Sequence, residues 1–383
     1  MADTPKLRVG VIFGGRSGEH AVSLMSARSV LAALNPEKYA VTQIGITRAG
    51  GWLVSTAPEG DVLEAMLDGN FAGLAQAALL PDPAQADLYV IKPSETGALL
   101  SLFARLDVVF PVLHGTFGED GSLQGLLELA DLAYVGSGVL GSALAMDKAA
   151  FKDVMRANGI PVLESVLALR SELHADIQSV ISRAEAMAAY PLFTKPANLG
   201  SSVGITKCRS RGDLLEGLME AASYDRRILI ERGISGREIE VSVLGNDDPQ
   251  ASIAGEVVPF GDFYTYESKY HDDRSELLIP APIPAEVAER ARELAVRAYK
   301  AIDGAGLARA DFLLDKATGD LYLNEINTIP GFTRISMYPK LWEASGITYP
   351  VLCDRLVELA LQRKADRDQT VREYHPQTEL ERT

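Results

Sequence analysis

Two carboxylates, an amide and a guanidinium stand at matching positions in the stretch RADFLLDKATGDLYLNEINTIPG, which begins at Arg309. The stretch reads as two apolar strands joined by a turn rich in Asp, Thr and Gly. Alternate side chains of a strand share one face, so Arg309 and Asp311 project together, as do Glu325 and Asn327. A hairpin centred on Thr318 places Asp311 opposite Glu325, and Arg309 opposite Asn327.

Opposed carboxylates on neighbouring strands, about 5 Å apart, repel each other and destabilise a plain sheet. A cation between them reverses the sign of this interaction. Two carboxylates and an amide form an all-oxygen ligand set that suits Mg²⁺ bound to phosphate. The alternative is a solvated acidic face, which the apolar residues around Asp311 and Glu325 disfavour. The hairpin therefore predicts a magnesium site.

A glycine- and serine-rich loop, NLGSSVG, lies between the apolar stretches PLFTKPA and ITKC. Its backbone N–H groups and hydroxyls could close over a phosphate. The loop is neither a Walker A sequence nor a GxGxxG dinucleotide motif, and most loops of this composition are simple turns. Lys195, in the apolar stretch before the loop, needs a partner if it is buried. Together with Lys148 it would supply two cations for a polyphosphate.

Two glutamates flank a connector in RRILIERGISGREIE: Glu231 ends an apolar strand, and Glu238 follows a short loop later. A connector with free backbone groups suits adenine, whose amino group needs an acceptor and whose ring nitrogen needs a donor. A plain interdomain connector explains these residues equally well.

His114 and Glu19 both follow predicted strands. His114 opens HGTFGEDGSLQG at the carboxyl end of a buried strand, where ligands of parallel α/β sheets bind. A substrate ligand and a packed loop histidine are equal alternatives for it. Glu119 and Asp120 precede a helix and fit its N-cap region. Glu19, in GGRSGEH, either caps the next helix or binds a substrate ammonium.

The stretch NTIPGFTRISMYPK continues directly from the second strand of the hairpin. Gly331 lets the backbone approach a ligand closely, and Ser336 with its neighbours could bind a carboxylate. Arg309 lies beside the expected metal, where negative charge develops on a transferred phosphoryl group.

The composition of the 383 residues is that of an ordinary globular protein, with 47% hydrophobic and 23% charged residues. The net charge of −15 argues against a nucleic acid or an anionic membrane as the main partner. Cys208 and Cys353 cannot form a disulfide framework and are expected to be buried free thiols. No apolar run reaches about 18 residues, and LRVGVIF is too short for a signal segment, so we expect a cytoplasmic protein.

The positioning elements begin with a strand, LRVGVIF, a glycine turn with a helix, and a second strand, YAVTQIGIT, which together predict a parallel α/β sheet. The strand LDVVFPVLHG continues this pattern. Residues 57–100 have weak periodicity and predict no clear element. The usual size of domains predicts two or three of them.

Seven motifs together resemble the D-alanine–D-alanine ligase family of the ATP-grasp fold: GGRSGEHAVSL, HGTFGEDGSLQG, GSALAMDKAAFK, FTKPANLGSSVG, YESKY, ARADFLLD and NEINTIPGFTRIS. The resemblance runs from about Arg8 to Leu361. It implies three α/β or α+β domains with ATP between the central and C-terminal ones. On this chain they would be an N-terminal parallel α/β substrate domain over 1–136, a central ATP-grasp domain over 137–234, a C-terminal ATP-grasp domain with the metal site over 235–365, and a polar tail over 366–383.

The resemblance also implies roles for individual residues. Two Mg²⁺ ions, with Mn²⁺ as an alternative, would be held by Asp311, Glu325 and Asn327. ATP would be bound by Lys148, Lys195, Ser201, Ser202, Glu231, Gly233, Ile234, Glu238, Asn324 and Glu325. The two D-alanines would lie near Glu19, His114, Lys269, Ser336 and Met337. The catalytic set would be Glu19, Ser201, Tyr270, Arg309, Gly331 and Ser336, in which Ser201 and Tyr270 hydrogen-bond with Glu19.

The reaction implied by the resemblance has two steps and yields D-alanyl-D-alanine for peptidoglycan synthesis. The carboxylate of the first D-alanine attacks the γ-phosphorus of ATP, giving an acyl phosphate and ADP. The amine of the second D-alanine then attacks the acyl phosphate, and phosphate leaves a tetrahedral intermediate. Arg309 and the N–H of Gly331 would stabilise the negative charge, and losing such a donor typically costs about 3–4 kcal/mol. Closure of the YESKY loop would exclude water.

A D-alanine–D-lactate ligase is the alternative within enzymes, and Tyr270 favours the dipeptide because the related depsipeptide ligases carry a different residue there, such as Phe or His. A nucleotide-binding regulator without catalysis would show gaps among the metal and phosphate residues, and none occurs. Two positions depart from the motifs: Ala21 stands where Glu is frequent, and Arg334 lies in the carboxylate-binding loop. The expected partners are D-alanine, ATP and a second copy of the chain in a homodimer.

Overall fold

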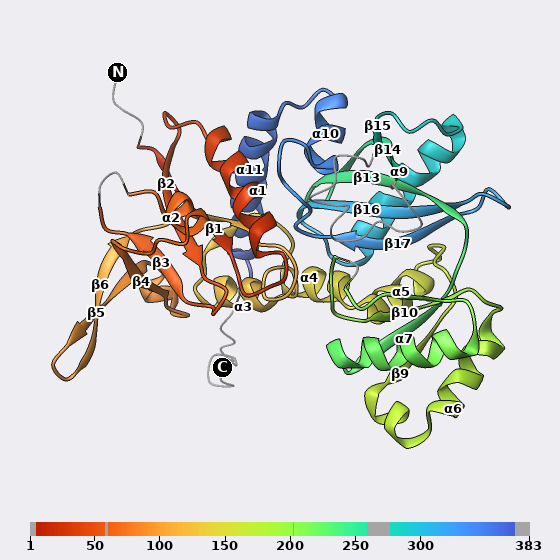
Figure 1. Ribbon diagram of the computed structural model, residues 1–383. Helices are drawn as coiled ribbons and strands as arrows, with labels where there is room; N and C mark the ends of the chain where they lie inside the picture. Colours follow the sequence, from red (N-terminus) through yellow and green to blue (C-terminus); the bar gives the residue numbers. More distant parts are fainter. Residues whose placement is uncertain (1–4, 58–59, 202, 259–275, 372–383) are drawn as a thin grey trace, which may run out of the picture.

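Three β-sheets organise the chain in the computed structural model, which describes residues 5–57, 60–201, 203–258 and 276–371. Their strands come from successive parts of the sequence, within residues 7–134, 165–232 and 236–327. In Figure 1 the first sheet lies on the left, the third at the upper right and the second below the third. The predicted α/β architecture is confirmed, and the exact domain boundaries stay a prediction.

The first sheet has eight strands in the order β6-β5-β4-β3-β2-β1-β7-β8. The strands β1, β2, β7 and β8 run parallel, as the sequence predicts, and the pairings from β2 through β6 are antiparallel. The strands are β1 (Leu7–Gly14), β2 (Tyr39–Ile46), β3 (Trp52–Ser55), β4 (Leu74–Leu79), β5 (Leu88–Ser94), β6 (Gly97–Ala104), β7 (Val108–Val112) and β8 (Ala133–Tyr134). The helices of this part are α1 (His20–Ala33), α2 (Val62–Leu67), the short 3-10 helix η1 (Pro83–Gln85) and α3 (Ser122–Leu129).

Residues 57–100, for which the sequence predicts no clear element, supply α2, β4, β5 and most of β6. The strands β5 and β6 form a hairpin that projects from the end of the sheet (Figure 1). Most residues of β6 are exposed, Leu99 at 61% and Leu102 at 53% among them. A strand with little burial on either face lacks the apolar and polar alternation of a half-buried strand, so its sequence gave no clear signal.

The second sheet has four antiparallel strands in the order β11-β10-β12-β9. Two long helices, α6 and α7, pack on it and close a buried apolar cluster. Asp147 begins α5, because its side chain accepts the N–H groups of Ala149 and Ala150. The elements are α4 (Val139–Met146), α5 (Lys148–Ala157), β9 (Ser165–Leu169), α6 (Arg170–Met187), β10 (Leu192–Pro196), β11 (Thr206–Cys208), α7 (Arg211–Tyr224) and β12 (Arg227–Arg232).

The third sheet has five antiparallel strands in the order β15-β14-β13-β16-β17. The helix α9 covers one face with an alanine-rich stripe that includes Ala291, Leu294, Ala295 and Ala298, all fully buried. The opposite face of this sheet carries the polar residues of the predicted site. The elements are β13 (Gly236–Gly245), β14 (Gln250–Val258), β15 (Glu276–Leu278), α9 (Ala285–Ala301), β16 (Gly306–Asp315) and β17 (Leu321–Asn327).

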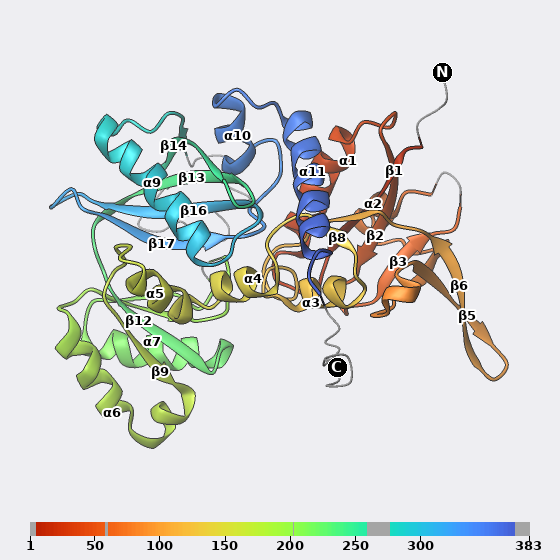
Figure 2. The same ribbon diagram turned by 180° about the vertical axis from the view of Figure 1, so that it is seen from behind.

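The last two helices, α10 (Met337–Ala344) and α11 (Tyr349–Arg367), return the chain to the first sheet. Seen from behind, α11 lies beside β8 and α1 (Figure 2). One apolar cluster therefore contains residues of both ends of the sequence, such as Val9 and Val108 with Leu356 and Val357. Phe332 lies at its edge, and its ring contacts three other aromatic rings, those of Phe110, Tyr338 and Tyr349.

The expectation for the two cysteines is confirmed. Cys208 and Cys353 are buried free thiols. Among the helices of the described residues, none combines the length and the apolar character that crossing a bilayer requires.

Replacing Phe332 with alanine should destabilise the fold by about 3–5 kcal/mol, because the side chain is 2% exposed and its loss leaves a cavity between both ends of the chain. Urea unfolding monitored by circular dichroism measures this change. The matched control is Phe71→Ala, since Phe71 is 47% exposed and its loss should change stability by about 0.5 kcal/mol or less. Equal effects of the two substitutions would contradict the shared core.

Candidate active site

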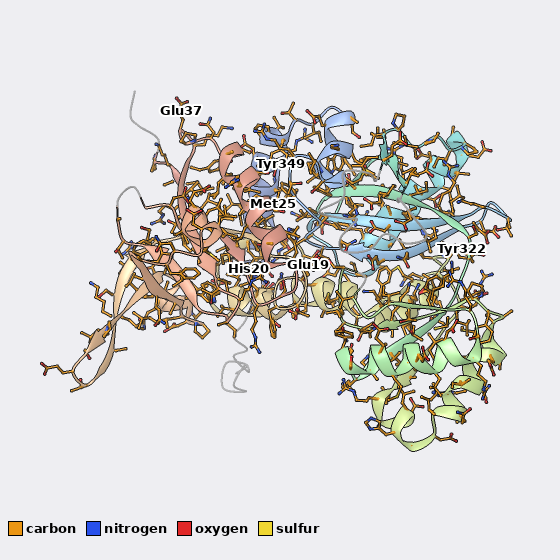
Figure 3. All side chains as sticks on the ribbon, viewed as in Figure 1. Glu19, His20, Met25, Glu37, Tyr322 and Tyr349 are labelled. Atoms are coloured by element: carbon orange, nitrogen blue, oxygen red, sulfur yellow. The ribbon has the colours of Figure 1, made fainter. Side chains whose placement is uncertain are left out.

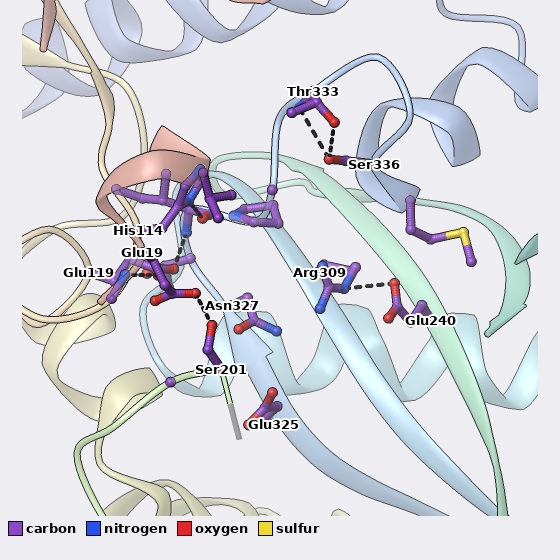
Figure 4. A pocket seen from close by; sticks show the side chains of 18 of the residues that line it. Glu19, His114, Glu119, Ser201, Glu240, Arg309, Glu325, Asn327, Thr333 and Ser336 are labelled. Atoms are coloured by element: carbon purple, nitrogen blue, oxygen red, sulfur yellow. Dashed lines mark hydrogen bonds and ion pairs between the residues drawn. The ribbon is translucent and has the colours of Figure 1, made fainter. Parts of the chain in front are cut away.

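A cavity of ≈ 450 Å³ is lined by residues from all three sheets or the loops that follow their strands (Figure 4). The predicted residues in its wall are Glu19, His114, Lys148, Ser201, Arg309, Glu325, Asn327, Gly331, Ser336 and Met337. Asp311 contacts two of them, Arg309 and Asn327. Six predicted nucleotide residues lie outside this wall: Lys195, Glu231, Gly233, Ile234, Glu238 and Asn324.

The strand register of the predicted hairpin is confirmed, since Asp311 pairs with Glu325 and Arg309 pairs with Asn327. The pairing toward the turn differs, because Phe312 pairs with Leu323 and the register shifts between Asp311 and Phe312. A β-bulge at this point absorbs one residue of β17. The turn-centred pairing is therefore correct only for the functional end of the hairpin.

A third acidic residue, Glu240, extends the pair into a row, and sequence reasoning missed it. Glu240 of β13 pairs with Asp311 of β16, which pairs with Glu325 of β17. Glu238 and Glu240 are two residues apart and share a face of β13. This spacing could have revealed Glu240 from the sequence. We call Glu240, Asp311 and Glu325 the acidic row.

Arg309 is the main counter-charge of the acidic row. Its Nε lies 2.7 Å from Asp311 Oδ1 and 2.8 Å from Glu240 Oε2, and its Nη2 lies 2.6 Å from Asp311 Oδ2. Asn327 Nδ2 donates to the same carboxylate at 2.9 Å. Lys148 Nζ lies 3.7 Å from Glu325 Oε2. The sequence predicted a role for Arg309 toward phosphate, and the structure adds two partly buried ion pairs, with Glu240 and Asp311.

The donor set at the acidic row fits a divalent cation bound to phosphate. The row contains three carboxylates, and the cations of Arg309 and Lys148 lie beside them. Carboxylate oxygens, together with the amide oxygen of Asn327, are the ligands that Mg²⁺ prefers. No group of three or more His, Cys, Asp or Glu residues arranged to hold a metal occurs in the described ranges. The expected set contains only two such residues and an amide.

Glu19 meets the glycine- and serine-rich loop across the cavity. Ser201 Oγ donates a hydrogen bond to Glu19 Oε1 (Figure 4), so the expected contact between these two residues is present. Ser201 holds a left-handed backbone angle, φ 53°, which is uncommon for a residue with a side chain. Glu19 precedes α1 but makes no side-chain bond to its first N–H groups. The helix-cap interpretation of Glu19 is therefore wrong.

Lys148 ties the second sheet to the acidic row. Its Nζ donates to the carbonyl oxygen of Leu199 at 2.8 Å, at the start of the glycine- and serine-rich loop, and lies near Glu325. A cation at the junction of a flexible loop and an acidic row can meet a phosphate from either side.

Lys195 and Glu231 form a buried ion pair that includes a further lysine. Glu231 is 1% exposed, and its Oε2 lies 3.1 Å from Lys195 Nζ and 3.3 Å from Lys152 Nζ. Burial acts to raise the pKa of Glu231, but the two lysines outweigh it and lower this pKa. Burial lowers the pKa of Lys152. Sequence reasoning missed Lys152, although it lies four residues after Lys148 on the same face of a helix.

The connector after β12 already uses one of its backbone groups. Gly233 N–H donates to the carbonyl oxygen of Pro191 at 2.9 Å. An added Cβ at Gly233 would lie 2.6 Å from that same oxygen, so only glycine fits there. A nucleotide base at this connector would therefore rely on neighbouring groups rather than on this N–H.

The loop after β17 brings Gly331 and Ser336 together at the cavity. A Cβ at Gly331 would lie 3.1 Å from Ser336 Oγ. Ser336 Oγ accepts the N–H of Thr333 at 3.1 Å, and Ser336 precedes the first turn of α10. Arg334 is exposed and is not part of the cavity wall, so its departure from the motif leaves the cavity unchanged.

Three predicted site residues lie outside the described residues: Ser202, Lys269 and Tyr270. Their roles stay predictions.

Two family models match the chain, one described as D-ala D-ala ligase N-terminus over residues 8–137 and one as D-ala D-ala ligase C-terminus over residues 154–358. A D-alanine–D-alanine ligase of Thermoanaerobacter sp. (strain X514) is 49% identical over 359 residues, which are 93% of this chain and 97% of the relative. A relative of the same name from Natranaerobius thermophilus is 45% identical over 370 residues, which are 96% of this chain and 99% of the relative.

Solved structures of similar proteins cover almost the whole chain. The D-alanine-D-alanine ligase from Coxiella burnetii superposes with a TM-score of 0.77 at 33% identity, over 96% of this chain and 97% of the other. The VanG D-Ala:D-Ser ligase from Enterococcus faecalis superposes with a TM-score of 0.82 at 35% identity, over 93% of this chain and all of the other.

Replacing Arg309 with methionine should destabilise the protein by about 3–5 kcal/mol, because it leaves Glu240 and Asp311 side by side without their shared cation. Urea unfolding gives the value. The matched control is Arg290→Met, whose exposed pair with Glu293 should contribute about 1 kcal/mol or less. A stability of Arg309→Met equal to that of the control would show that Arg309 does not balance the acidic row.

Proposed function

Because the chain belongs to the D-alanine–D-alanine ligase family, which has the ATP-grasp fold, we propose that it joins two D-alanines to D-alanyl-D-alanine with conversion of ATP to ADP and phosphate. This product serves peptidoglycan synthesis. The observation that carries the proposal is the pairing of two charged groups in one cavity. The carboxylate of Glu19 stands on one side, and Arg309 with the acidic row stands on the other.

The first D-alanine presents its ammonium to Glu19. The carboxylate of Glu19 is held by the hydroxyl of Ser201, and both residues line the cavity. An ion pair with a further hydrogen bond is stronger than a neutral contact. The hydrogen bond also ties substrate binding to the glycine- and serine-rich loop. Tyr270 is the proposed third member of this group, on family grounds.

ATP binds between the second and third sheets in this proposal. Its phosphates meet Lys148, Lys195 and the loop residues Ser201 and Ser202. The base and ribose meet the connector and its glutamates, with the residues Glu231, Gly233, Ile234, Glu238 and Asn324. The ion pair of Lys195 with Glu231 supports this, because Lys195 can exchange a carboxylate for a phosphate while Lys152 keeps Glu231 compensated.

Two Mg²⁺ ions, or Mn²⁺, would be held by Asp311, Glu325 and Asn327. When bound, such ions neutralise the charge of the β- and γ-phosphates of ATP. The opposed positions of Asp311 and Glu325, with the amide of Asn327 beside Asp311, support this assignment.

The residues of the cavity support both chemical steps. Arg309 stabilises the negative charge that develops on the transferred phosphoryl group, and the N–H of Gly331 stabilises the tetrahedral intermediate. The second D-alanine places its carboxylate at Ser336 and Met337, where the first turn of α10 contributes the positive end of its helix dipole. Lys269, on family grounds, lies near the same carboxylate, and His114 near that of the first D-alanine.

The chain alone with ATP should release phosphate when D-alanine is added, and should release little with L-alanine or D-lactate. The second substrate is tested by pairing D-alanine with D-lactate or with D-serine. A predominant ester product near neutral pH would contradict the dipeptide proposal. A homodimer remains an expectation from the family, and the absence of a membrane or nucleic-acid partner remains an expectation from the net charge of −15.

Replacing Asp311 with asparagine should lower kcat by about 10²–10³-fold, because it removes one proposed metal ligand and one partner of Arg309. Phosphate release measures this loss. The matched control is Asp320→Asn in the exposed turn of the same hairpin, which should retain the unmodified rate. A fully active Asp311→Asn variant would contradict the proposed metal site.

Replacing Glu19 with glutamine should raise the KM for D-alanine by about 10–100-fold, because a hydrogen bond to a charged group contributes about 1.5–3 kcal/mol. The KM for ATP should change little. Glu37→Gln is the control, since Glu37 lies at the outer edge of the molecule, far from Glu19 (Figure 3). Equal rises of both KM values would indicate a general disturbance instead of lost ammonium binding.

A further inference from the structure

The loop 328–332 joins the metal-site strand β17 to the segment before α10, and it carries Gly331. Three of its backbone polar groups are bonded by side chains that belong to the first sheet and its helix. They are the N–H and carbonyl of Ile329 and the N–H of Phe332. These contacts span more than 200 residues of sequence. No local pattern predicts them.

Glu119 bonds to two loops at once. Its Oε1 accepts the N–H of Ile329 at 2.9 Å, and its Oε2 accepts the N–H of Gly115 at 2.7 Å. The carboxylate therefore ties the loop after β7 to the loop after β17. The N-cap interpretation of Glu119 is wrong, because α3 begins after Gly121 and it is Asp120 that accepts a nearby N–H.

His114 and Ser26 complete the contact. His114 Nδ1 lies 2.9 Å from the carbonyl oxygen of Ile329, which can only accept, so Nδ1 carries the proton. Nε2 then accepts from Ser26 Oγ at 3.0 Å, and Ser26 Oγ accepts the N–H of Phe332 at 3.3 Å. Burial lowers the pKa of His114, which keeps this neutral tautomer. Both ring nitrogens are used, so these contacts favour the packed-loop interpretation of His114.

Two of the three side chains are buried, and Glu119 is half-buried in the wall of the cavity. Ser26 is fully buried, His114 is 3% exposed, and the loop residues Ile329 and Phe332 are 5% and 2% exposed. A buried N–H or carbonyl that loses its protein partner cannot form a hydrogen bond with water in its place. The three side chains therefore hold the loop by three of its backbone groups.

We propose that Ser26, His114 and Glu119, the loop cradle, are positioning residues for the ligation reaction. His114 and Glu119 bond Ile329, which lies two residues after the expected metal ligand Asn327 and two before the expected donor Gly331. Ser26 bonds the N–H of Phe332, the residue after Gly331. The cradle thereby fixes the distance between the acidic row and the N–H of Gly331. A donor displaced by about 1 Å can cost about 10²-fold in rate. This inference rests on the proposed function.

Both oxygens of Glu119 accept N–H groups, so the loop cradle needs the ionised carboxylate, and assays at pH 9 favour that form. Burial and the charge of Glu19 raise the pKa of Glu119 to about 8. The two backbone N–H groups and Arg309 act in the opposite direction and lower this pKa, but their effect is smaller. Replacing Glu119 with glutamine then exchanges one acceptor oxygen for an NH₂ group that faces a backbone N–H. The substitution keeps the size of the side chain and removes one of its two hydrogen bonds to backbone N–H groups.

Glu119→Gln should lower kcat for D-alanine-dependent phosphate release by about 10–100-fold, while the KM values for ATP and D-alanine stay within about threefold. Ser26→Ala removes the bonds to His114 and to the N–H of Phe332 but leaves both bonds to Ile329, so it should lower kcat by about 3–10-fold. ATP affinity measured by calorimetry should match that of the unmodified chain in both variants. This split between kcat and binding separates positioning from a general loss of structure.

The matched control is Asp354→Asn. Asp354 of α11 also links two distant parts of the chain, by bonds to Lys38 at 2.5 Å and Tyr39 at 2.7 Å, but outside the cavity wall. Its kcat should stay within about twofold of the unmodified value.

Unchanged kcat in Glu119→Gln, or equal losses in kcat and ATP affinity, would overturn the inference. If Glu119→Gln does not fold, Ser26→Ala decides by the same two measurements. An unmodified chain that releases no phosphate with D-alanine would instead refute the proposed function.

Discussion

The acidic row imposes the electrostatic constraint on which the cavity depends. Glu240, Asp311 and Glu325 lie side by side on three hydrogen-bonded strands, in a region where their side chains are largely withdrawn from water. Opposed carboxylates at this spacing repel unless cations lie among them. Arg309 and Lys148 occupy those places, and each also defines another part of the site. Arg309 faces the proposed path of the phosphoryl group, and Lys148 holds the start of the glycine- and serine-rich loop.

The three sheets are joined at the cavity by contacts of two different kinds. The first and third share an apolar core through α11 and Phe332, reinforced by the loop cradle. The helices α4 and α5, which precede the second sheet, share an apolar cluster with the third sheet. The loop after β10 and Lys148 meet the cavity through polar contacts, among them Ser201 with Glu19 and Lys148 with Glu325. Apolar burial holds two bodies together whatever ligand is present, whereas ion pairs and hydrogen bonds can be exchanged for those of a ligand. The arrangement suits a cavity in which phosphate and ammonium replace internal partners.

Local patterns in the sequence predicted most of the candidate site and missed residues whose partners are distant. The motifs supplied Glu19, Ser201 and the hairpin, and the structure brings them into one cavity. Glu240 could have been found from its spacing to Glu238, and Lys152 from its spacing to Lys148. The roles of Ser26 and Glu119 could not, since their partners in the loop 328–332 become neighbours only when α11 and the first sheet pack together.

The sequence by itself determined the class of fold, the family and the register of the catalytic hairpin at its functional end. A strand alternates with a period of two and a short turn fixes which residues face each other, so nearby residues suffice for that prediction. The tertiary structure alone decided that Glu240 of β13 joins the acidic row, that Glu19 bonds to Ser201 and does not cap its helix, and that His114 turns both ring nitrogens toward protein. These choices depend on the free energy of burying polar groups between segments far apart in the chain, and only the packed molecule brings those groups within bonding distance.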